Sequence, residues 1–255
     1  MFVEERQEEI LNLLYRDGKV RVKDLSEKFG VTEDCIRKDL ASLEKRDLLQ
    51  RAYGGAVIKE RAHKGHSQKV SARHNKNIEE KKTIAKKAVQ LVKDGDVIFL
   101  DTSTTNEEIA KEILKSGKKV RVVSSMLDIA NVFAGEHEVE FILLGGTYYQ
   151  SQNSYLGAMT LQMLAPFRFD LAFIGVVGAD LFQNTLSTYE PDDGILKKMA
   201  MKQSKNVYLA MESQKFEFQG NYAFGKWEDV TGVLCETSLD KEKRQQLKKY
   251  GVKVF

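Results

Sequence analysis

The hydrophobic pattern of this 255-residue chain changes its period after residue 77. Before that point, apolar residues recur at helical spacing in three short segments, 4–16, 22–29 and 33–45. Beyond it, short apolar runs alternate with amphipathic segments, the pattern of strands and helices in a mostly parallel sheet. The sequence therefore predicts a small helical domain followed by a larger α/β domain.

The first 58 residues predict three helices and a β-hairpin. Thr32 is a suitable N-cap for the third helix, 33–45, because its hydroxyl can accept from a free amide of the first turn. A Gly54-Gly55 pair then lies between two short apolar runs, which is typical of a hairpin turn. Three helices and a hairpin predict a winged helix-turn-helix domain over residues 1–58.

Residues 59–77 show no sustained helical or strand period, and they predict a linker. Six basic and only one acidic residue fall in this segment, whereas charge is nearly balanced in the rest of the chain. This composition is typical of a solvent-exposed linker, and it is equally typical of a segment that binds DNA phosphates electrostatically. Three histidines of the linker lack cysteine or carboxylate partners at metal-ligand spacing, so no metal site is expected at His63, His66 or His74.

Residues 78–255 predict one α/β domain. No internal repeat of fixed period stands out, and only two prolines interrupt this part of the chain. The apolar runs expected to form strands are 97–100, 120–123, 139–144, 171–174 and 207–210.

The chain opens without a basic and then apolar leader, and no apolar run approaches about 18 residues, so a cytoplasmic protein is expected. Cys35 and Cys235 lie far apart, form no CxxC pair and predict reduced thiols.

The third helix presents a polar face that suits DNA. Ile36 and Leu40 turn inward, and at about 100° per residue Arg37 and Lys38 lie on or beside the opposite face. Arg and Lys donate to guanine O6 and N7 in the major groove, and Asp accepts from cytosine N4. An ordinary solvated face has the same composition. The residues predicted to contact DNA are Thr32, Asp34, Cys35, Arg37, Lys38, Lys45, Arg51, Tyr53 and Gly54.

A hydroxyl-rich turn, 102–105, follows the strand that ends near Asp101 and precedes a helix. Free amides and the positive end of the helix dipole favour an anion there, and ligands of parallel sheets gather at the carboxyl ends of strands. The alternative is that Thr105 or a neighbour only caps the helix. Similar turns follow other strands at Ser124-Ser125, Gly145-Gly146 and Gly175–Gly178.

The stretch VTEDCIRKDLASLEKRDLLQRAYGGAV resembles the recognition helix and wing of the DeoR-type transcription repressors, with their pattern V-S-x-x-T-I-R-R-D-L followed by L-x-R-x-H-G-G-A. The matching residues are Val31, Ile36, Arg37, Asp39, Leu40, Leu43, Arg51, Gly54, Gly55 and Ala56. Cys35, Asp47 and Tyr53 depart from the usual Thr, Gly and His, which bears on the operator sequence rather than on DNA binding.

The second domain resembles the sugar-phosphate-sensing domain of the same family, with a fold like that of ribose-5-phosphate isomerase and the CoA transferases. Asp101, Thr104 and Thr105 match a D-x-G-T-T turn, and Lys197 matches a lysine on a late helix. Ser103 stands in place of the usual Gly, and Glu212 in place of Asp. The resemblance and the strand-end turns together predict an effector site at Asp101, Thr102, Ser103, Thr104, Thr105, Ser124, Ser125, Gly145, Gly146, Gly175, Lys197, Glu212 and Lys215.

This resemblance implies a DNA-binding transcription regulator, a repressor of a carbohydrate-metabolism operon whose operator affinity is modulated by a phosphorylated sugar or related phosphometabolite. The expected partners are a double-stranded DNA operator, this effector and further copies of the chain, because paired half-sites give helix-turn-helix proteins their specificity. No cofactor and no catalytic residue are expected.

Two other functions fit parts of the sequence. A sugar-phosphate isomerase needs a positioned base, and FDLAFIGVVGAD offers only Asp180, which a structural cap would explain equally. A DNA-binding protein without an effector would need no ligand-binding residues in its second domain. The hydroxyl-rich turn 102–105, together with Lys197 and Lys215, argues against this alternative.

Overall fold

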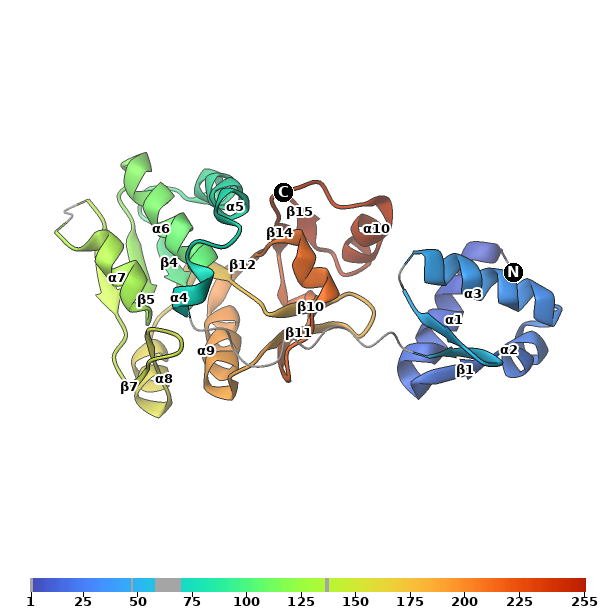
Figure 1. Ribbon diagram of the computed structural model, residues 1–255. Helices are drawn as coiled ribbons and strands as arrows, with labels where there is room; N and C mark the ends of the chain where they lie inside the picture. The colour runs from blue at the N-terminus through green and yellow to red at the C-terminus, as the bar shows by residue number, and fades with distance from the viewer. Residues whose placement is uncertain (1, 47, 58–69, 136–137) are drawn as a thin grey trace. The chain divides into compact units, whose positions relative to one another are not determined.

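The computed structural model describes residues 2–46, 48–57, 70–135 and 138–255. The chain divides into two compact units, Met1–Arg61 and Ala62–Phe255, each with its own core (Figure 1). They are called unit 1 and unit 2 below.

Unit 1 combines three helices with a three-stranded antiparallel sheet in the order β1-β3-β2. The expected helices and hairpin are confirmed, whereas β1 had no separate signal in the sequence because it spans only three residues. Gly18 and Gly30 end the first two helices in the left-handed conformation. The elements are α1 Val3–Asp17, β1 Lys19–Arg21, α2 Val22–Phe29, α3 Glu33–Lys45, β2 Gln50–Ala52 and β3 Gly55–Val57.

A close approach of two strands explains the second glycine of the Gly54-Gly55 pair. A Cβ atom at Gly55 would lie 1.9 Å from the carbonyl oxygen of Val20 on β1. Gly54 instead has a φ of 76°, which only glycine adopts without strain. The pair therefore both turns the wing and lets it pair with β1.

A buried ion pair holds α1 against α3. Arg6 Nε lies 2.6 Å from Asp39 Oδ2, and the two side chains are only 7% and 5% exposed. Gln7 Nε2 donates to the other carboxylate oxygen of Asp39 at 3.1 Å. Around these contacts the apolar faces of the helices are buried, as the helical spacing predicted, through Ile10, Leu14, Leu25, Ile36, Leu40 and Leu43. The position of α3 thus depends on a polar contact as well as on apolar packing.

Unit 2 is built on a seven-stranded, wholly parallel sheet in the order β15-β14-β12-β9-β4-β5-β6. The five expected strands occupy neighbouring positions in it, which confirms the mostly parallel α/β fold. The strands are β4 Val97–Leu100, β5 Arg121–Ser124, β6 Glu140–Leu143, β9 Phe169–Ile174, β12 Ser204–Ala210, β14 Gly232–Leu234 and β15 Lys253–Val254.

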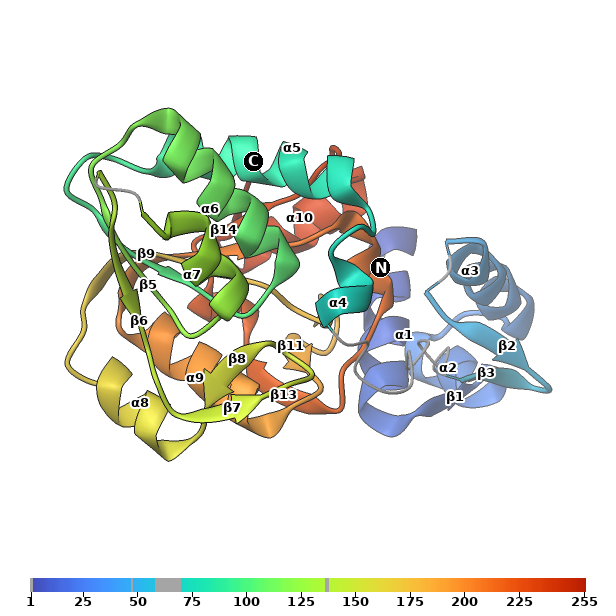
Figure 2. The ribbon, with the colours of Figure 1, turned by 60° about the vertical axis from the view of Figure 1, so that its left-hand side comes forward.

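Helices cover both faces of this sheet (Figure 2). Apolar residues of α5, α6 and α7 form one core cluster, and those of α8, α9 and α10 belong to the other. The helices of unit 2 are α4 Val70–Arg73, α5 Ile78–Leu91, α6 Thr104–Ser116, α7 Leu127–Phe133, α8 Ala158–Leu164, α9 Pro191–Lys202 and α10 Lys241–Lys249, with 3-10 turns at η1 Ser213–Glu217 and η2 Trp227–Asp229.

Two small antiparallel sheets complete unit 2, and neither was expected from the sequence. Strands β10 Gly178–Asp180, β11 Thr185–Thr188 and β13 Tyr222–Gly225 form one, and β7 Thr147–Tyr149 and β8 Ser154–Leu156 form the other. Trp227, fully buried beside the first, donates from its indole nitrogen to the carbonyl of Asp180 at 2.8 Å.

The last eight residues of the segment predicted as a linker, 70–77, are packed on unit 2. Residues 70–77, called the strap below, begin with the helix α4 and lead directly into α5. Val70 is 2% exposed, and its amide donates to the carbonyl of Ser151 at 2.9 Å. The strap is therefore packed on unit 2. The rest of the predicted linker, including His63 and His66, lies outside the described residues.

Within the described part of the chain, no helix is both long and apolar enough to cross a membrane. Cys35 and Cys235 are both free thiols. Burial raises the pKa of the Cys235 thiol to about 12, so this thiol is essentially protonated at neutral pH.

Replacing Asp39 with Ala should destabilise unit 1, because Arg6 would stay buried without its carboxylate and Gln7 would lose an acceptor. We expect a loss of roughly 2 to 3 kcal/mol. Asp34→Ala is the matched control on the same helix, since Asp34 pairs with Lys38 in solvent at 3.3 Å and should cost less than about 1 kcal/mol. Chemical denaturation of both variants measures the difference, and equal losses would contradict a structural role for the buried pair.

Candidate functional site

The outward face of α3 is open to solvent, as the helical spacing predicted. Asp34, Arg37, Lys38 and Lys45 are exposed, whereas Ile36, Leu40 and Leu43 are buried. Thr32 caps the helix by accepting from the amide of Cys35 at 3.3 Å. A capped helix with one apolar and one polar face can enter the major groove.

The two basic residues at the centre of this face are paired with acidic neighbours one turn away. Arg37 Nη2 lies 2.5 Å from Glu33 Oε2, and Lys38 Nζ lies 3.3 Å from Asp34 Oδ2. All four side chains are at least 46% exposed, so each pair contributes little to stability. Both cations can therefore turn to DNA at small cost.

The remaining predicted DNA contacts divide between the wing and the interior. Tyr53, at the tip of the hairpin beside Gly54, is fully exposed, and Arg51 on β2 is exposed and paired with Glu44 at 3.0 Å. Cys35 instead turns toward α1, where Arg6 Nη2 lies 3.2 Å from its sulfur. The structure thus brings the wing residues to the surface and leaves Cys35 partly buried.

Unit 2 contains a cavity of about 120 Å³ at the N-terminal end of α6. Eight of the predicted effector residues line it: Thr102, Ser103, Thr104, Thr105, Gly175, Lys197, Glu212 and Lys215. The N-terminal end of a helix favours an anion because its first amides lack partners within the helix. Ser103 uses its side chain to cap α6, accepting from the amide of Asn106 at 3.2 Å. The replacement of the family's Gly by Ser103 therefore adds a cap at the cavity wall.

Beside the cavity, Asp101 is the centre of a buried polar cluster. One oxygen of Asp101 accepts from Asn106 Nδ2 at 2.5 Å. The other accepts from the amide of Gly175 at 2.6 Å and pairs with Lys197. Asp101 and Lys197 are 2% and 4% exposed.

A second carboxylate completes this cluster. Asp193 Oδ1 lies 3.1 Å from Lys197 Nζ, and its two oxygens accept from the hydroxyls of Thr102 at 2.8 Å and Thr188 at 2.7 Å. Burial raises the pKa of Asp101. Burial alone would lower the pKa of Lys197, but attraction to Asp101 and Asp193 outweighs it and raises that pKa. The ammonium group of Lys197 is therefore charged and shared by two carboxylates.

The strap forms another wall of the cavity, through Arg73, Lys76 and Asn77. Arg73 Nη2 donates to Gln152 Oε1 at 3.0 Å, and Asn77 Nδ2 donates to Glu212 Oε1 at 2.7 Å. Burial lowers the pKa of Arg73, although nearby carboxylates oppose this effect. The strap is thus held to the cavity by two polar contacts.

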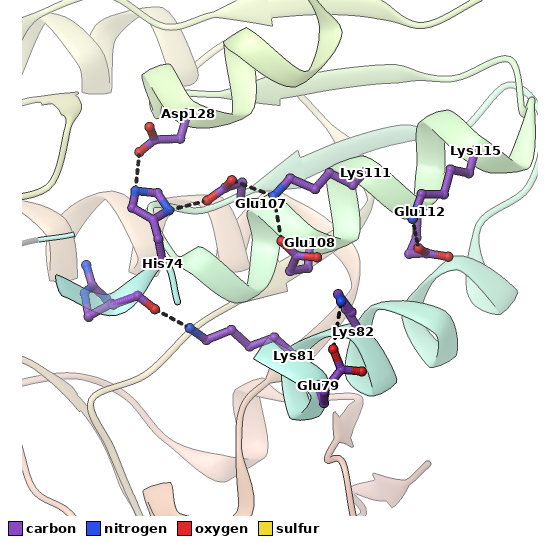
Figure 3. Close-up of polar contacts among 11 residues, drawn as sticks. His74, Glu79, Lys81, Lys82, Glu107, Glu108, Lys111, Glu112, Lys115 and Asp128 are labelled. Atoms are coloured by element: carbon purple, nitrogen blue, oxygen red, sulfur yellow. Dashed lines mark hydrogen bonds and ion pairs between the residues drawn. The ribbon is translucent and has the colours of Figure 1, made fainter. Parts of the chain in front are cut away.

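Figure 3 shows further contacts of the strap with unit 2. His74 lies between two carboxylates, with Nδ1 2.8 Å from Glu107 Oε2 and Nε2 3.7 Å from Asp128 Oδ2. Lys81 of α5, 3% exposed, donates to the carbonyl oxygen of Arg73 at 2.6 Å. Within the described residues, no group of three or more His, Cys, Asp or Glu side chains is placed to hold a metal ion.

Five of the predicted effector residues do not line the cavity: Asp101, described above, and Ser124, Ser125, Gly145 and Gly146. Ser124 and Ser125 are fully buried, and the hydroxyl of Ser124 accepts from the amide of Met126 at 3.2 Å. The carbonyl oxygen of Gly145 accepts from the hydroxyl of Thr160 at 2.8 Å. A Cβ atom on Gly146 would lie 2.1 Å from the hydroxyl oxygen of Thr160. The two serines and two glycines therefore support turns at the strand ends outside the cavity.

The cavity also has walls that sequence reasoning missed. They include Arg73, Lys76, Asn77, Lys81, Gln152, Thr188, Tyr189, Asp193 and Gln214. The basic composition of residues 59–77 is the sequence signal for Arg73 and Lys76, but the same composition also predicts a linker. The others come from distant parts of the chain and carried no local motif.

Comparison with protein families agrees with this division into two units. A model of the DeoR-like helix-turn-helix domain matches residues 6–62, and a model of the DeoR C terminal sensor domain matches residues 76–237. The chain belongs to the DeoR family. It is a DNA-binding transcription regulator that combines the helix-turn-helix domain of this family with its sensor domain.

Named relatives support the assignment. The chain is 32% identical to the lactose phosphotransferase system repressor of Lactococcus lactis subsp. lactis, over 83% of this chain and 82% of the relative. It is 31% identical to the lactose phosphotransferase system repressor of Streptococcus mutans serotype c, over 97% of each chain. Among solved structures it is similar to ribose 5-phosphate isomerase A of Methanocaldococcus jannaschii, with 19% identity, a TM-score of 0.39, and 53% and 52% of the two chains covered. That likeness is too distant to bear on activity.

For this DeoR family member, the double variant Arg37→Ala, Lys38→Ala should lose specific DNA affinity while keeping its fold, because both side chains are exposed. Each good base contact contributes roughly 1 to 3 kcal/mol. Titration at fixed salt, against a duplex that the unmodified protein selects from a randomised pool, measures the loss. Lys115→Ala on α6 is the control, and unchanged affinity of the double variant would remove both residues from the interface.

Replacing Lys197 with Met should destabilise unit 2 by about 3 to 5 kcal/mol at neutral pH, because Asp101 and Asp193 would lose their buried cation. Lys198→Met, at the next and exposed position of α9, is the matched control. Denaturation at several pH values measures both losses.

The loss at Lys197 should become smaller as the pH falls. The pKa of Asp101 is raised in the folded protein, so the folded state binds its proton more tightly than the unfolded state does. Lys197 opposes this rise, so its removal raises the pKa of Asp101 further. The extra cost of the ionised carboxylate in Lys197→Met is therefore absent below the ordinary aspartate pKa and grows as the pH rises. A loss that does not change with pH would contradict this account.

Proposed function

We propose that this protein is a repressor of carbohydrate-metabolism genes, and that a phosphorylated sugar or related phosphometabolite in the unit 2 cavity changes its affinity for its operator. The observation that carries the proposal is the cavity itself, where the N-terminal end of α6 meets the hydroxyls of Thr102, Ser103, Thr104 and Thr105. This cavity lies in the sensor domain of a DNA-binding protein, and each of the two relatives named above is a lactose phosphotransferase system repressor.

The chemistry of the cavity favours a ligand with both hydroxyls and an anionic group. Helix amides and side-chain hydroxyls donate to phosphate oxygens, and basic side chains supply the charge. Glu212 can accept from a sugar hydroxyl at the same time, because its hydrogen bonds from Asn77 and Gln214 both engage Oε1. A phosphate ester of a sugar combines both features, whereas a neutral sugar would use only the second.

We propose that the cavity carries no isomerase activity. Asp180, the carboxylate considered for such a reaction, accepts from the amides of Phe182 at 2.8 Å and Gln183 at 2.9 Å and so supports a turn. Asp180 is not one of the cavity residues. Conversion of ribose 5-phosphate to its ketose by the purified protein would overturn this part of the proposal.

We further propose that the protein acts as a homo-oligomer, because one winged helix-turn-helix contacts a single half-site and two domains are needed for a paired site. Light scattering of the free protein and of its DNA complex gives the number of chains in each. A single chain in both would contradict the proposal.

Calorimetry with matched pairs of sugars and their phosphate esters tests the ligand class. One ester should bind while its unphosphorylated sugar does not. The substitution Thr104→Ala should lower the affinity for that ester by about tenfold. Thr83→Ala, at an exposed position of α5, is the control. The ester should also change operator affinity, and the operator should change ester affinity by the same factor. Equal affinity for the two members of every pair would reject a phosphate site.

A further inference from the structure

One long stretch of unit 2 carries no charge. Residues 141–167 contain no Asp, Glu, Lys, Arg or His, although 30% of the whole chain is charged. The stretch covers most of β6, the hairpin of β7 and β8, and α8, with the hairpin following β6 and α8 beside it (Figure 2). A wholly buried segment would need no charge, so the exposure of its side chains decides how this composition is interpreted.

Several apolar side chains of this stretch are open to solvent. Of the eight large apolar side chains that the described residues leave exposed, three lie here: Tyr148, Met159 and Met163, with exposed fractions of 49%, 67% and 43%. Met159 and Met163 are one turn apart on α8, so they project from the same side of the helix. Thr160 and Leu164 are buried. One side of α8 therefore packs on unit 2, and the other presents an apolar face to solvent.

The exposed side chains are neighbours because α8 is joined to the end of β6. The hydroxyl of Thr160 donates to the carbonyl oxygen of Gly145 at 2.8 Å, and the amide of Gly145 lies 3.3 Å from the sulfur of Met163. Tyr148 follows three residues later, and its hydroxyl donates to Asn153 of the same hairpin at 2.9 Å. Its phenol group is thus already satisfied, so the ring can be covered at little cost. Tyr148, Met159 and Met163 are called the uncharged face below.

The strand β6, Glu140–Leu143, adds a sheet edge beside this face. It is the last strand of the seven-stranded sheet, and among the described strands it pairs only with β5. Proteins commonly protect such edges with charged residues or proline. The one charged residue of β6, Glu140, is instead paired with Arg121 of β5 at 2.7 Å. The edge therefore lacks the usual protection against pairing with another chain.

The absence of charge indicates which kind of partner fits the uncharged face. DNA and phosphate esters are bound largely through charged groups, which this face does not have. A second copy of the chain presents the same face, so the two surfaces meet without repulsion between like charges, and a two-fold contact uses the same surface on both copies. Arg168, which borders the stretch, donates to the carbonyl oxygens of Ala165 and Phe167 at 3.3 and 2.8 Å, so its own chain already engages it.

We propose that the uncharged face is the surface through which unit 2 binds a second copy of this chain, with β6 at its border. This inference rests on the proposed function, because it assigns a surface to the homo-oligomer proposed there. Tyrosine and methionine are enriched in protein interfaces, and the flexible methionine side chain adapts its shape to a partner. The contact uses no residue of α3 or of the wing, so each chain keeps these for its own half-site.

Substitution on α8 tests the surface. Sedimentation of the full chain over a range of concentrations gives the dissociation constant of the oligomer. We expect Met159→Glu and Met163→Glu each to raise this constant by about tenfold or more, because a two-fold contact would bury the unpaired carboxylate in both copies. Met159→Leu keeps an apolar side chain and should associate normally. Gln90→Glu is the matched control, since it adds the same charge at an exposed position of α5.

Hydrogen exchange locates the contact without any substitution. The amides of β6 and α8 should exchange more slowly in the oligomer than after dilution to single chains, whereas those of α10 should not change. Unchanged exchange in both β6 and α8 on dissociation would overturn the proposal.

The outcomes separate this inference from the proposed function. If the unmodified protein associates and both glutamate variants associate equally tightly, the uncharged face is not the interface, and the proposed homo-oligomer stands. If the unmodified protein is a single chain both in solution and on DNA, the inference and the proposed homo-oligomer are both overturned. Thermal unfolding shows whether the variants fold, and Met163→Glu keeps the test valid if Met159→Glu does not. Ester binding by calorimetry tests the proposed ligand separately from either result.

Discussion

The arrangement of unit 2 depends on keeping one carboxyl group, that of Asp101, away from water. Asp101 directly follows β4, and its two oxygens contact the first turn of α6, the amide that follows β9, and Lys197 of α9. A buried carboxylate is tolerated only when such partners replace its hydration, so all three elements have to converge on one point. The cavity lies beside that point because the carboxyl ends of these strands meet there.

The same cluster sets the electrostatic character of the cavity. Since Lys197 serves two carboxylates, the donors that the cavity leaves for a ligand are the first amides of α6 and the basic residues on the other walls. Two of these basic residues, Arg73 and Lys76, belong to the strap, which precedes α5 in the sequence.

Unit 1 shows a similar division between buried and exposed charge. Asp39 is buried and fixes α3 against α1, whereas Arg37 and Lys38, its immediate neighbours, are exposed and paired only with residues of their own helix. A one-residue shift along a helix turns a side chain by about 100°, which is enough to separate the two roles. The helix is thus held rigidly on one face and is free to contact DNA on the other.

The sequence by itself determined the elements and the family of this protein. Helical and strand periods depend only on neighbouring residues, so α1, α2, α3 and the five neighbouring strands from β12 to β6 could be predicted, and the motifs near Arg37 and Asp101 are local as well. The strap could not be predicted, because α4 is only four residues long and its burial depends on Ser151 and Gln152.

The partners of Lys197 were likewise decided by the tertiary structure. Asp101 and Lys197 are 96 residues apart, and no local pattern shows that the lysine expected to meet a ligand is shared by two carboxylates. Which charges remain available to a ligand depends on contacts between distant segments, and those contacts exist only once the sheet has brought the strand ends together.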